Sequence, residues 1–148
     1  MKPAMIAFAL VLFLGCAAQP LDREVISTDN APKAIGPYSQ AIRVGNTVYL
    51  AGQIAIEPAT GLMVAGGIEE QTHQVLKNIQ AVLAAAGFTL DDVVQSQVFL
   101  SDLNNYAVMN AVYGSYFKVA PPARAAMQVA RLPKDALIEI MVTAVKTK

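Results

Sequence analysis

Three polar residues interrupt apolar stretches of this sequence, and their side chains are the best candidates for chemistry. Arg124 opens the segment RAAMQVA after two prolines, and its guanidinium stays charged even when it is buried. Glu139 lies in the middle of LIEIMV, where a carboxylate must be paired, hydrogen-bonded or protonated. Asn110 falls within the aromatic stripe of a predicted helix, and a buried amide needs hydrogen-bond partners. Arg124 therefore predicts an anion-binding site.

Each of the three residues also has a structural interpretation that the sequence leaves open. Arg124 fits an edge-strand arginine whose head group reaches solvent. Glu139 fits an internal salt bridge to Arg124 or Arg131, although Arg131 also fits a contact that holds the turn before the last strand. Asn110 fits a hydrogen bond that positions a segment beside its helix.

The sequence lacks the residues that several other kinds of active site require. It has one histidine, His73, predicted to be exposed on its helix, and one cysteine, Cys16. These are too few ligands for a metal site, and the domain after Cys16 has no thiolate. No serine has a histidine placed to activate it. Eleven basic and eleven acidic residues balance without a block of like charge, which argues against a nucleic-acid partner.

The elements that must position these residues follow from the hydrophobic periodicity. Strands are predicted at residues 24–27, 41–44, 47–54, 92–100, 124–130 and 136–146. A first helix is predicted over residues 68–86 and ends at Gly87. A second helix is predicted to begin at an Asn104-Asn105 cap and to continue to about Lys118. This order predicts an α+β fold, a two-layer sandwich of a mixed β-sheet with two helices on one face.

The last predicted strand carries apolar residues at both of its alternating sets of positions, apart from Glu139. This pattern is typical of a strand that is buried on both sides. Because two helices cover one face only, we expect a homo-oligomer in which the other face packs against a neighbouring sheet.

Residues 1–20 differ in composition from the rest of the chain. One lysine, an apolar run and then small residues predict a secretory signal segment that is too short to span a bilayer comfortably. LFLGCAA predicts a bacterial lipoprotein with a lipid on Cys16, and cleavage after Ala18 is the alternative. The expected location is the periplasm or a lipid-anchored position at the membrane, or the cytoplasm if the start codon is misassigned. Residues 21–148 are predicted to form one domain.

Four segments of this domain resemble the Rid (YjgF-like) family of enamine and imine deaminases. They are NAPKAIGPYSQAI, LAGQI, VFLSDLNNYAVMNAVYGSYF and PPARAAMQVARLPKDALIEI, in the order of the family. The resemblance implies a chorismate-mutase-like fold and a homotrimer with clefts between its subunits. It also implies hydrolysis of 2-imino or 2-enamino acids to 2-keto acids and ammonia, an activity of the 2-iminobutanoate/2-iminopropanoate deaminase type. No cofactor is expected, because an imine is already activated toward water.

The resemblance further assigns roles to single residues. Arg124 corresponds to the carboxylate-binding arginine of the family, and Glu139 corresponds to the cleft glutamate, expected to orient and deprotonate a water. The implied substrate-binding positions are Tyr38, Gly52, Asn110 and Ala126.

Two positions depart from the pattern of the family. Ala51 stands where its deaminases commonly have serine, and Ala126 stands where they often have cysteine. These departures bear on substrate range and rate. The alternative function is a non-catalytic trimer of the same fold that binds a small carboxylate or a partner protein. Ala51 favours this alternative slightly, whereas Glu139 favours the enzyme. A ribonuclease function, which has been attached to relatives, lacks a histidine pair and a basic patch here.

Overall fold

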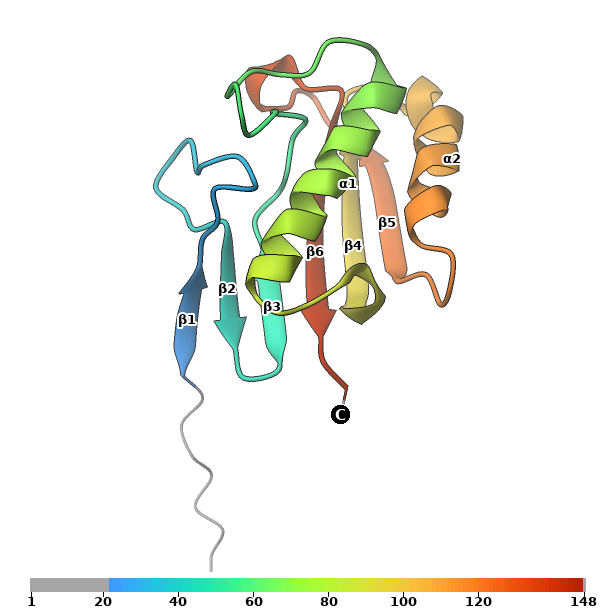
Figure 1. Ribbon diagram of the computed structural model, residues 1–148. Coiled ribbons are helices and arrows are strands. Elements are labelled where there is room, and N and C mark those ends of the chain that lie inside the picture. The colour runs from blue at the N-terminus through green and yellow to red at the C-terminus, as the bar shows by residue number, and fades with distance from the viewer. Residues whose placement is uncertain (1–21, 148) are drawn as a thin grey trace, which may run out of the picture.

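A mixed sheet of six strands carries two helices on one of its faces (Figure 1). The computed structural model describes residues 22–147. The strands are β1 (Arg23–Ile26), β2 (Ala41–Val44), β3 (Thr47–Leu50), β4 (Val93–Leu100), β5 (Ala123–Gln128) and β6 (Ile138–Val145). Their order in the sheet is β1-β2-β3-β6-β4-β5, and only β4 and β5 pair in parallel within the described residues. The predicted α+β sandwich is confirmed.

Helix α1 (Ile68–Ala85) packs on the centre of the sheet. Its apolar stripe, which includes Val75, Ile79 and Val82, is fully buried against the strands below. Glu70 accepts a hydrogen bond from the backbone N–H of Gly67 at 2.7 Å, which satisfies a free donor at the start of the helix. The helix stops before Gly87, whose φ of 77° continues into a left-handed turn, as the sequence predicts.

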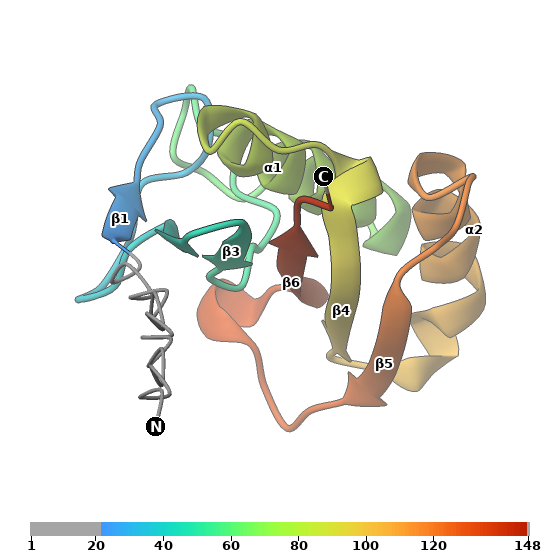
Figure 2. The same cartoon turned by 90° about the horizontal axis from the view of Figure 1, so that it is seen from below.

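Helix α2 (Tyr106–Tyr116) packs beside α1, on the half of the sheet that holds β4 and β5 (Figure 2). Asn105 precedes α2 as the predicted cap residue, but the side-chain bond of a cap comes from Asp102, at the start of the short 3-10 turn Leu103–Asn105 that leads into the helix. Asp102 accepts from the backbone N–H of Asn104 at 2.8 Å, whereas the side chain of Asn105 makes no capping bond and its backbone is already helical. No helix within residues 22–147 is long and apolar enough to cross a membrane.

The core lies between the helices and one face of the sheet. On β6 the side chains that face the helices are buried, namely Ile138, Ile140, Val142 and Ala144. The alternate set on the other face is only partly covered within one chain, namely Glu139, Met141, Thr143 and Val145. We call this other side the open face of the sheet.

Strand β3 is shorter than the sequence predicts. It ends at Leu50, and the chain bends away from the sheet before Gln53 rejoins β6. Gln53 and Ile140 exchange two backbone hydrogen bonds, of 2.9 and 3.0 Å. The bend places Gly52 directly beside Glu139, so it matters for the site.

Candidate active site

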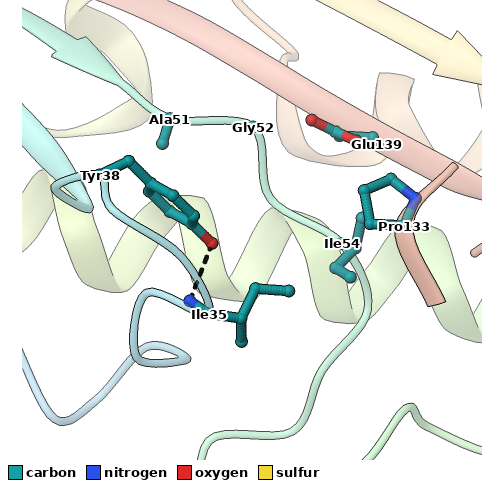
Figure 3. A pocket seen from close by; sticks show the side chains of 7 residues that line it. All are labelled: Ile35, Tyr38, Ala51, Gly52, Ile54, Pro133 and Glu139. Atoms are coloured by element: carbon teal, nitrogen blue, oxygen red, sulfur yellow. Dashed lines mark hydrogen bonds between the residues drawn. The ribbon is translucent and has the colours of Figure 1, made fainter.

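A pocket of about 260 Å³ opens beside Glu139 (Figure 3). Strand β6, the bend after β3, the loop between β1 and β2, and the turn before β6 all contribute to its wall. The residues that line it are Ile35, Tyr38, Ala51, Gly52, Ile54, Pro133 and Glu139. The pocket is therefore mostly apolar, with one carboxylate and one phenol among its side chains.

Glu139 is the acidic group of this pocket. Its side chain is half-buried, and this burial raises the pKa of the carboxyl above its ordinary value. Among the described residues, no salt bridge reaches Glu139. Arg131 instead binds Asp135 through bonds of 2.6 and 3.1 Å, which ties down the turn before β6 as predicted. The carboxylate of Glu139 is thus available to a ligand or a water.

Gly52 lets the backbone lie against this carboxylate. A Cβ at position 52 would collide with the Glu139 side chain. Figure 3 shows Ala51 and Tyr38 on one side of the pocket, with Glu139 and Pro133 on the other. The predicted substrate-binding position at Gly52 therefore lies next to the predicted catalytic carboxylate.

Tyr38 forms the wall across from Glu139, and its own loop holds it there. The Tyr38 hydroxyl accepts a hydrogen bond from the backbone N–H of Ile35 at 3.1 Å (Figure 3). The buried side chain of Gln40 anchors the same loop, a role that no sequence pattern indicates. Gln40 accepts from the N–H of Thr28 at 2.7 Å and donates to the carbonyls of Thr28, Ala31 and Pro32 at 3.0, 3.3 and 2.7 Å.

Arg124 belongs to a second cluster, between β5 and α2. Its Nη2 donates to Asn110 Oδ1 at 2.7 Å and to the Tyr106 hydroxyl at 3.1 Å. The guanidinium carbon lies 4.5 Å from the centre of the Tyr113 ring, which is a cation–π contact. A cavity of about 380 Å³ adjoins this cluster between the helix and the loop at Pro121. The sequence places Tyr106 in the aromatic stripe but does not indicate its bond to Arg124.

Asn110 is exposed, so the prediction of a buried amide is wrong. Helix α2 lies over the edge of the sheet, and only Met109, Val112 and Tyr113 of the helix are buried. Asn110 falls on the flank of that buried face, where the side chain of Arg124 meets it. The helical stripe was recognised correctly, but its edge faces Arg124 instead of the core.

His73 also departs from its prediction. The ring is half-buried, because α2 packs alongside α1, and its Nδ1 lies 3.0 Å from the Tyr116 hydroxyl. This contact joins the two helices, and neither residue lines the pocket of Glu139.

The two predicted catalytic residues lie on opposite faces of the sheet. Strand register pairs Arg124 with Ser96 and then Val142, on the face that the helices cover. Glu139 pairs with Phe99 on the open face. Arg124 and Glu139, which the sequence places in one cleft, therefore do not share a cleft within a single chain. Two half-sites result, one with Tyr38, Gly52 and Glu139, and one with Asn110 and Arg124.

Ala126 lies on the helix-covered face, beside Val98 of β4 and two residues after Arg124. Its side chain is partly buried and packs against the core. Ala126 thus belongs to the strand of the arginine half-site and makes no contact with the pocket of Glu139.

Known proteins align with this chain over almost the whole of residues 21–148. A RutC family protein of Pyrococcus horikoshii is 57% identical over 124 residues, which is 84% of this chain and 98% of the relative. The human 2-iminobutanoate/2-iminopropanoate deaminase is 49% identical over 126 residues, 85% of this chain and 92% of that protein. A crystal structure of a Rid family protein from Yersinia pestis superposes with a TM-score of 0.82 at 50% identity, covering 84% of this chain and all of the other.

These comparisons overturn the prediction of an exported lipoprotein. The two relatives compared by sequence are an archaeal and a human protein, and the match covers 98% of the archaeal one. That relative therefore has no segment corresponding to residues 1–20, and neither it nor the human relative supports a signal peptide or a lipid anchor. Cys16 and Ala18, on which the prediction rested, lie outside the described residues.

The profile of a known family also matches the chain. Residues 28–146 match the family described as Endoribonuclease L-PSP. The matched span contains both half-sites, from Tyr38 to Glu139. Together with the relatives and the shared fold, this match establishes the resemblance carried by the four sequence segments: the chain belongs to the Rid (YjgF-like) family.

Proposed function

We propose that this protein hydrolyses reactive 2-imino and 2-enamino acids to 2-keto acids and ammonia, at a site that two copies of the chain complete. The observation that carries the proposal is the pair of half-sites. One half-site holds an available carboxylate beside an apolar pocket, and the other holds a guanidinium fixed by Asn110 and Tyr113. A small 2-imino acid needs both a cation for its carboxylate and a base for the attacking water.

An assembly of copies, a homotrimer by the family resemblance, would bring the half-sites together. Three large apolar side chains, Val25, Tyr49 and Met127, are 55%, 52% and 39% exposed on the open face of one chain. A neighbouring copy is the expected cover for this face. Strand β5 is an edge strand, so Arg124 lies at the rim, where it can meet the Glu139 pocket of the next copy.

Arg124 binds the substrate in this proposal. Its guanidinium donates charged hydrogen bonds to the planar carboxylate next to the C=N bond, which fixes the imine carbon. The apolar wall of Ile35, Ile54 and Pro133 then receives the short aliphatic side chain of the substrate.

Glu139 moves the protons of the reaction. Its carboxylate takes a proton from water as the water oxygen bonds to the imine carbon, and it passes that proton to the nitrogen as the C=N π bond breaks. The resulting carbinolamine loses its hydroxyl proton to Glu139. The C–N bond then breaks, and Glu139 protonates the nitrogen, which leaves as ammonia. Within one chain, burial raises the pKa of this carboxyl, which makes it a stronger base than an ordinary glutamate.

A binding protein without turnover is the competing function, favoured by Ala51 where the deaminases of the family commonly have serine. In such a protein Arg124 would still bind the carboxylate of the ligand, but Glu139 would transfer no proton. The description of the family as an endoribonuclease finds no support in these residues, because the single histidine contacts Tyr116 and the net formal charge is zero.

The substitution Arg124→Ala tests the proposal. Because it removes the charged carboxylate donors, we expect kcat/KM for 2-iminopropanoate to fall by about a hundredfold or more while the oligomer persists. The imine is generated by an amino-acid oxidase, and its decay is followed with semicarbazide. Arg43→Ala, which removes a cation that lines neither half-site and contacts Glu24 and Phe88 instead, serves as the control and should keep wild-type activity. Full activity of the Arg124→Ala protein would contradict the role of Arg124 in binding the substrate carboxylate. Wild-type protein that binds pyruvate without accelerating imine hydrolysis would support the binding function instead.

A further inference from the structure

The hydrogen bonds of Arg124 use N–H groups that the guanidinium would need to bind a carboxylate through two bonds. Within residues 22–147 both of its bonds start from Nη2, one to Asn110 Oδ1 and one to the Tyr106 hydroxyl. An Nη nitrogen carries two hydrogens, so these two acceptors account for both of them.

A carboxylate can form two parallel bonds with a guanidinium along only two edges. The end-on edge uses one hydrogen each of Nη1 and Nη2, and the side-on edge uses one hydrogen each of Nε and Nη2. The third edge, between Nε and Nη1, is blocked by the Cδ of the arginine itself. Both usable edges therefore need a hydrogen of Nη2, and a bidentate carboxylate must displace Asn110 or Tyr106.

The contacts indicate which acceptor leaves. The bond to Asn110 is the shorter one, 2.7 Å against 3.1 Å for Tyr106. Tyr106 is the first residue of α2 and is 41% exposed, so its hydroxyl can turn to water without loss of a hydrogen bond. The buried ring of Tyr113 packs against the guanidinium through the cation–π contact and helps to hold it in position.

We propose that Tyr106 is a placeholder in the empty site: its hydroxyl occupies one carboxylate-binding hydrogen of Arg124 and is displaced when the carboxylate of a ligand binds. Asn110 and Tyr113 keep the guanidinium in position throughout. Tyr106 is thus a positioning residue that competes with the ligand. This inference rests on the proposed function only in taking a small carboxylate as the ligand, and it needs no turnover.

The substitution Tyr106→Phe tests the placeholder. It keeps the ring beside Arg124 and removes only the competing acceptor. We expect pyruvate to bind about two- to tenfold more tightly by isothermal titration calorimetry, because one exchanged hydrogen bond is lost from the empty site. KM for 2-iminopropanoate should fall by a similar factor, with little change in kcat. Methyl pyruvate, which has no carboxylate, should bind equally to both proteins.

The substitution Asn110→Ala should change pyruvate affinity in the opposite direction to Tyr106→Phe. Removal of the anchor should weaken pyruvate binding, whereas a simple loss of any Arg124 partner would shift both variants in the same direction. Weaker or unchanged pyruvate binding by Tyr106→Phe overturns the placeholder, as does an absence of pyruvate binding in both the wild-type and Tyr106→Phe proteins. Pyruvate binding that responds to Tyr106→Phe without any imine hydrolysis would support the placeholder and reject the proposed enzyme.

Discussion

At the scale of single residues, Glu139 is the group whose environment bears most directly on reactivity. Its carboxyl is half-buried, burial raises its pKa, and no described residue neutralises it with a salt bridge. Burial of an unpaired carboxylate makes the fold less stable. Groups of this kind are common at functional sites, so Glu139 is a candidate for proton transfer.

Replacement of Glu139 by Gln separates chemistry from binding. The amide keeps the size of the side chain but cannot accept the proton of water, so kcat should fall by about a hundredfold or more while pyruvate binding changes little. Steady-state kinetics and calorimetry provide the two readouts. Equal losses of turnover and binding would recast Glu139 as a structural residue.

The raised pKa of Glu139 also predicts how stability depends on pH. The folded protein keeps this proton at pH values where the unfolded chain has lost it, so Glu139 makes the fold less stable as pH rises from the ordinary carboxyl pKa through the raised one. Below both pKa values, the neutral Glu139 and its Gln replacement are nearly equivalent. Glu139→Gln should therefore gain stability over wild type as pH rises, measured as the urea midpoint between about pH 4 and pH 8. A constant difference across this range would contradict the desolvated carboxyl.

At the scale of elements, the bend after β3 shapes the pocket. The bend brings Gly52 against Glu139, and the backbone of Gly52 lies outside the positive-φ region in which a side chain is strained. The constraint at position 52 is therefore the missing Cβ alone.

The substitution Gly52→Ala should push the Glu139 carboxylate out of its place and lower kcat/KM by at least about tenfold. A double-mutant cycle checks the cause. If the methyl group acts through Glu139, then Gly52→Ala should cost much less in a protein that already carries Glu139→Gln. Independent, additive losses would assign the effect to the substrate instead.

At the scale of the whole molecule, the two half-sites face opposite sides of the sheet. The proposed activity therefore requires contact between copies, with Arg124 from one copy and Glu139 from the next. The large exposed apolar residues of the open face are the surface that we expect a neighbouring copy to cover.

Mixed oligomers test this shared site. Arg124→Ala and Glu139→Gln proteins should each be inactive, but unfolding and refolding an equal mixture should restore about one quarter of the wild-type sites, as expected for random pairing of copies. Activity is measured before and after refolding, with each variant refolded alone as the control. If the mixture stays inactive although native mass spectrometry shows mixed oligomers, both residues act within one chain or at separate sites.

Much of the fold follows from local patterns that a sequence displays directly. Helix α1 was predicted over residues 68–86 and spans Ile68–Ala85, because its apolar stripe and Gly87 are both encoded locally. The exact bounds of β2 follow from alternation and the Gly45-Asn46 turn. The end of β3 was missed, because Gly52 leaves the sheet to make room for Glu139, which is distant in the sequence. The cap position of α2 at Asn105 follows from the sequence, but the side-chain bond from Asp102 does not, because a 3-10 turn precedes the helix.

The sequence by itself determined the fold class, the family and the polar residues worth testing, since their types and motifs are local properties. Only the tertiary structure decided which of them meet. Strand register turned Arg124 and Glu139 to opposite faces, and the position of α2 over the sheet edge turned Asn110 toward Arg124 instead of the core. Register and helix placement depend on packing across the whole sheet, because a shift of one residue reverses the face of every side chain on a strand.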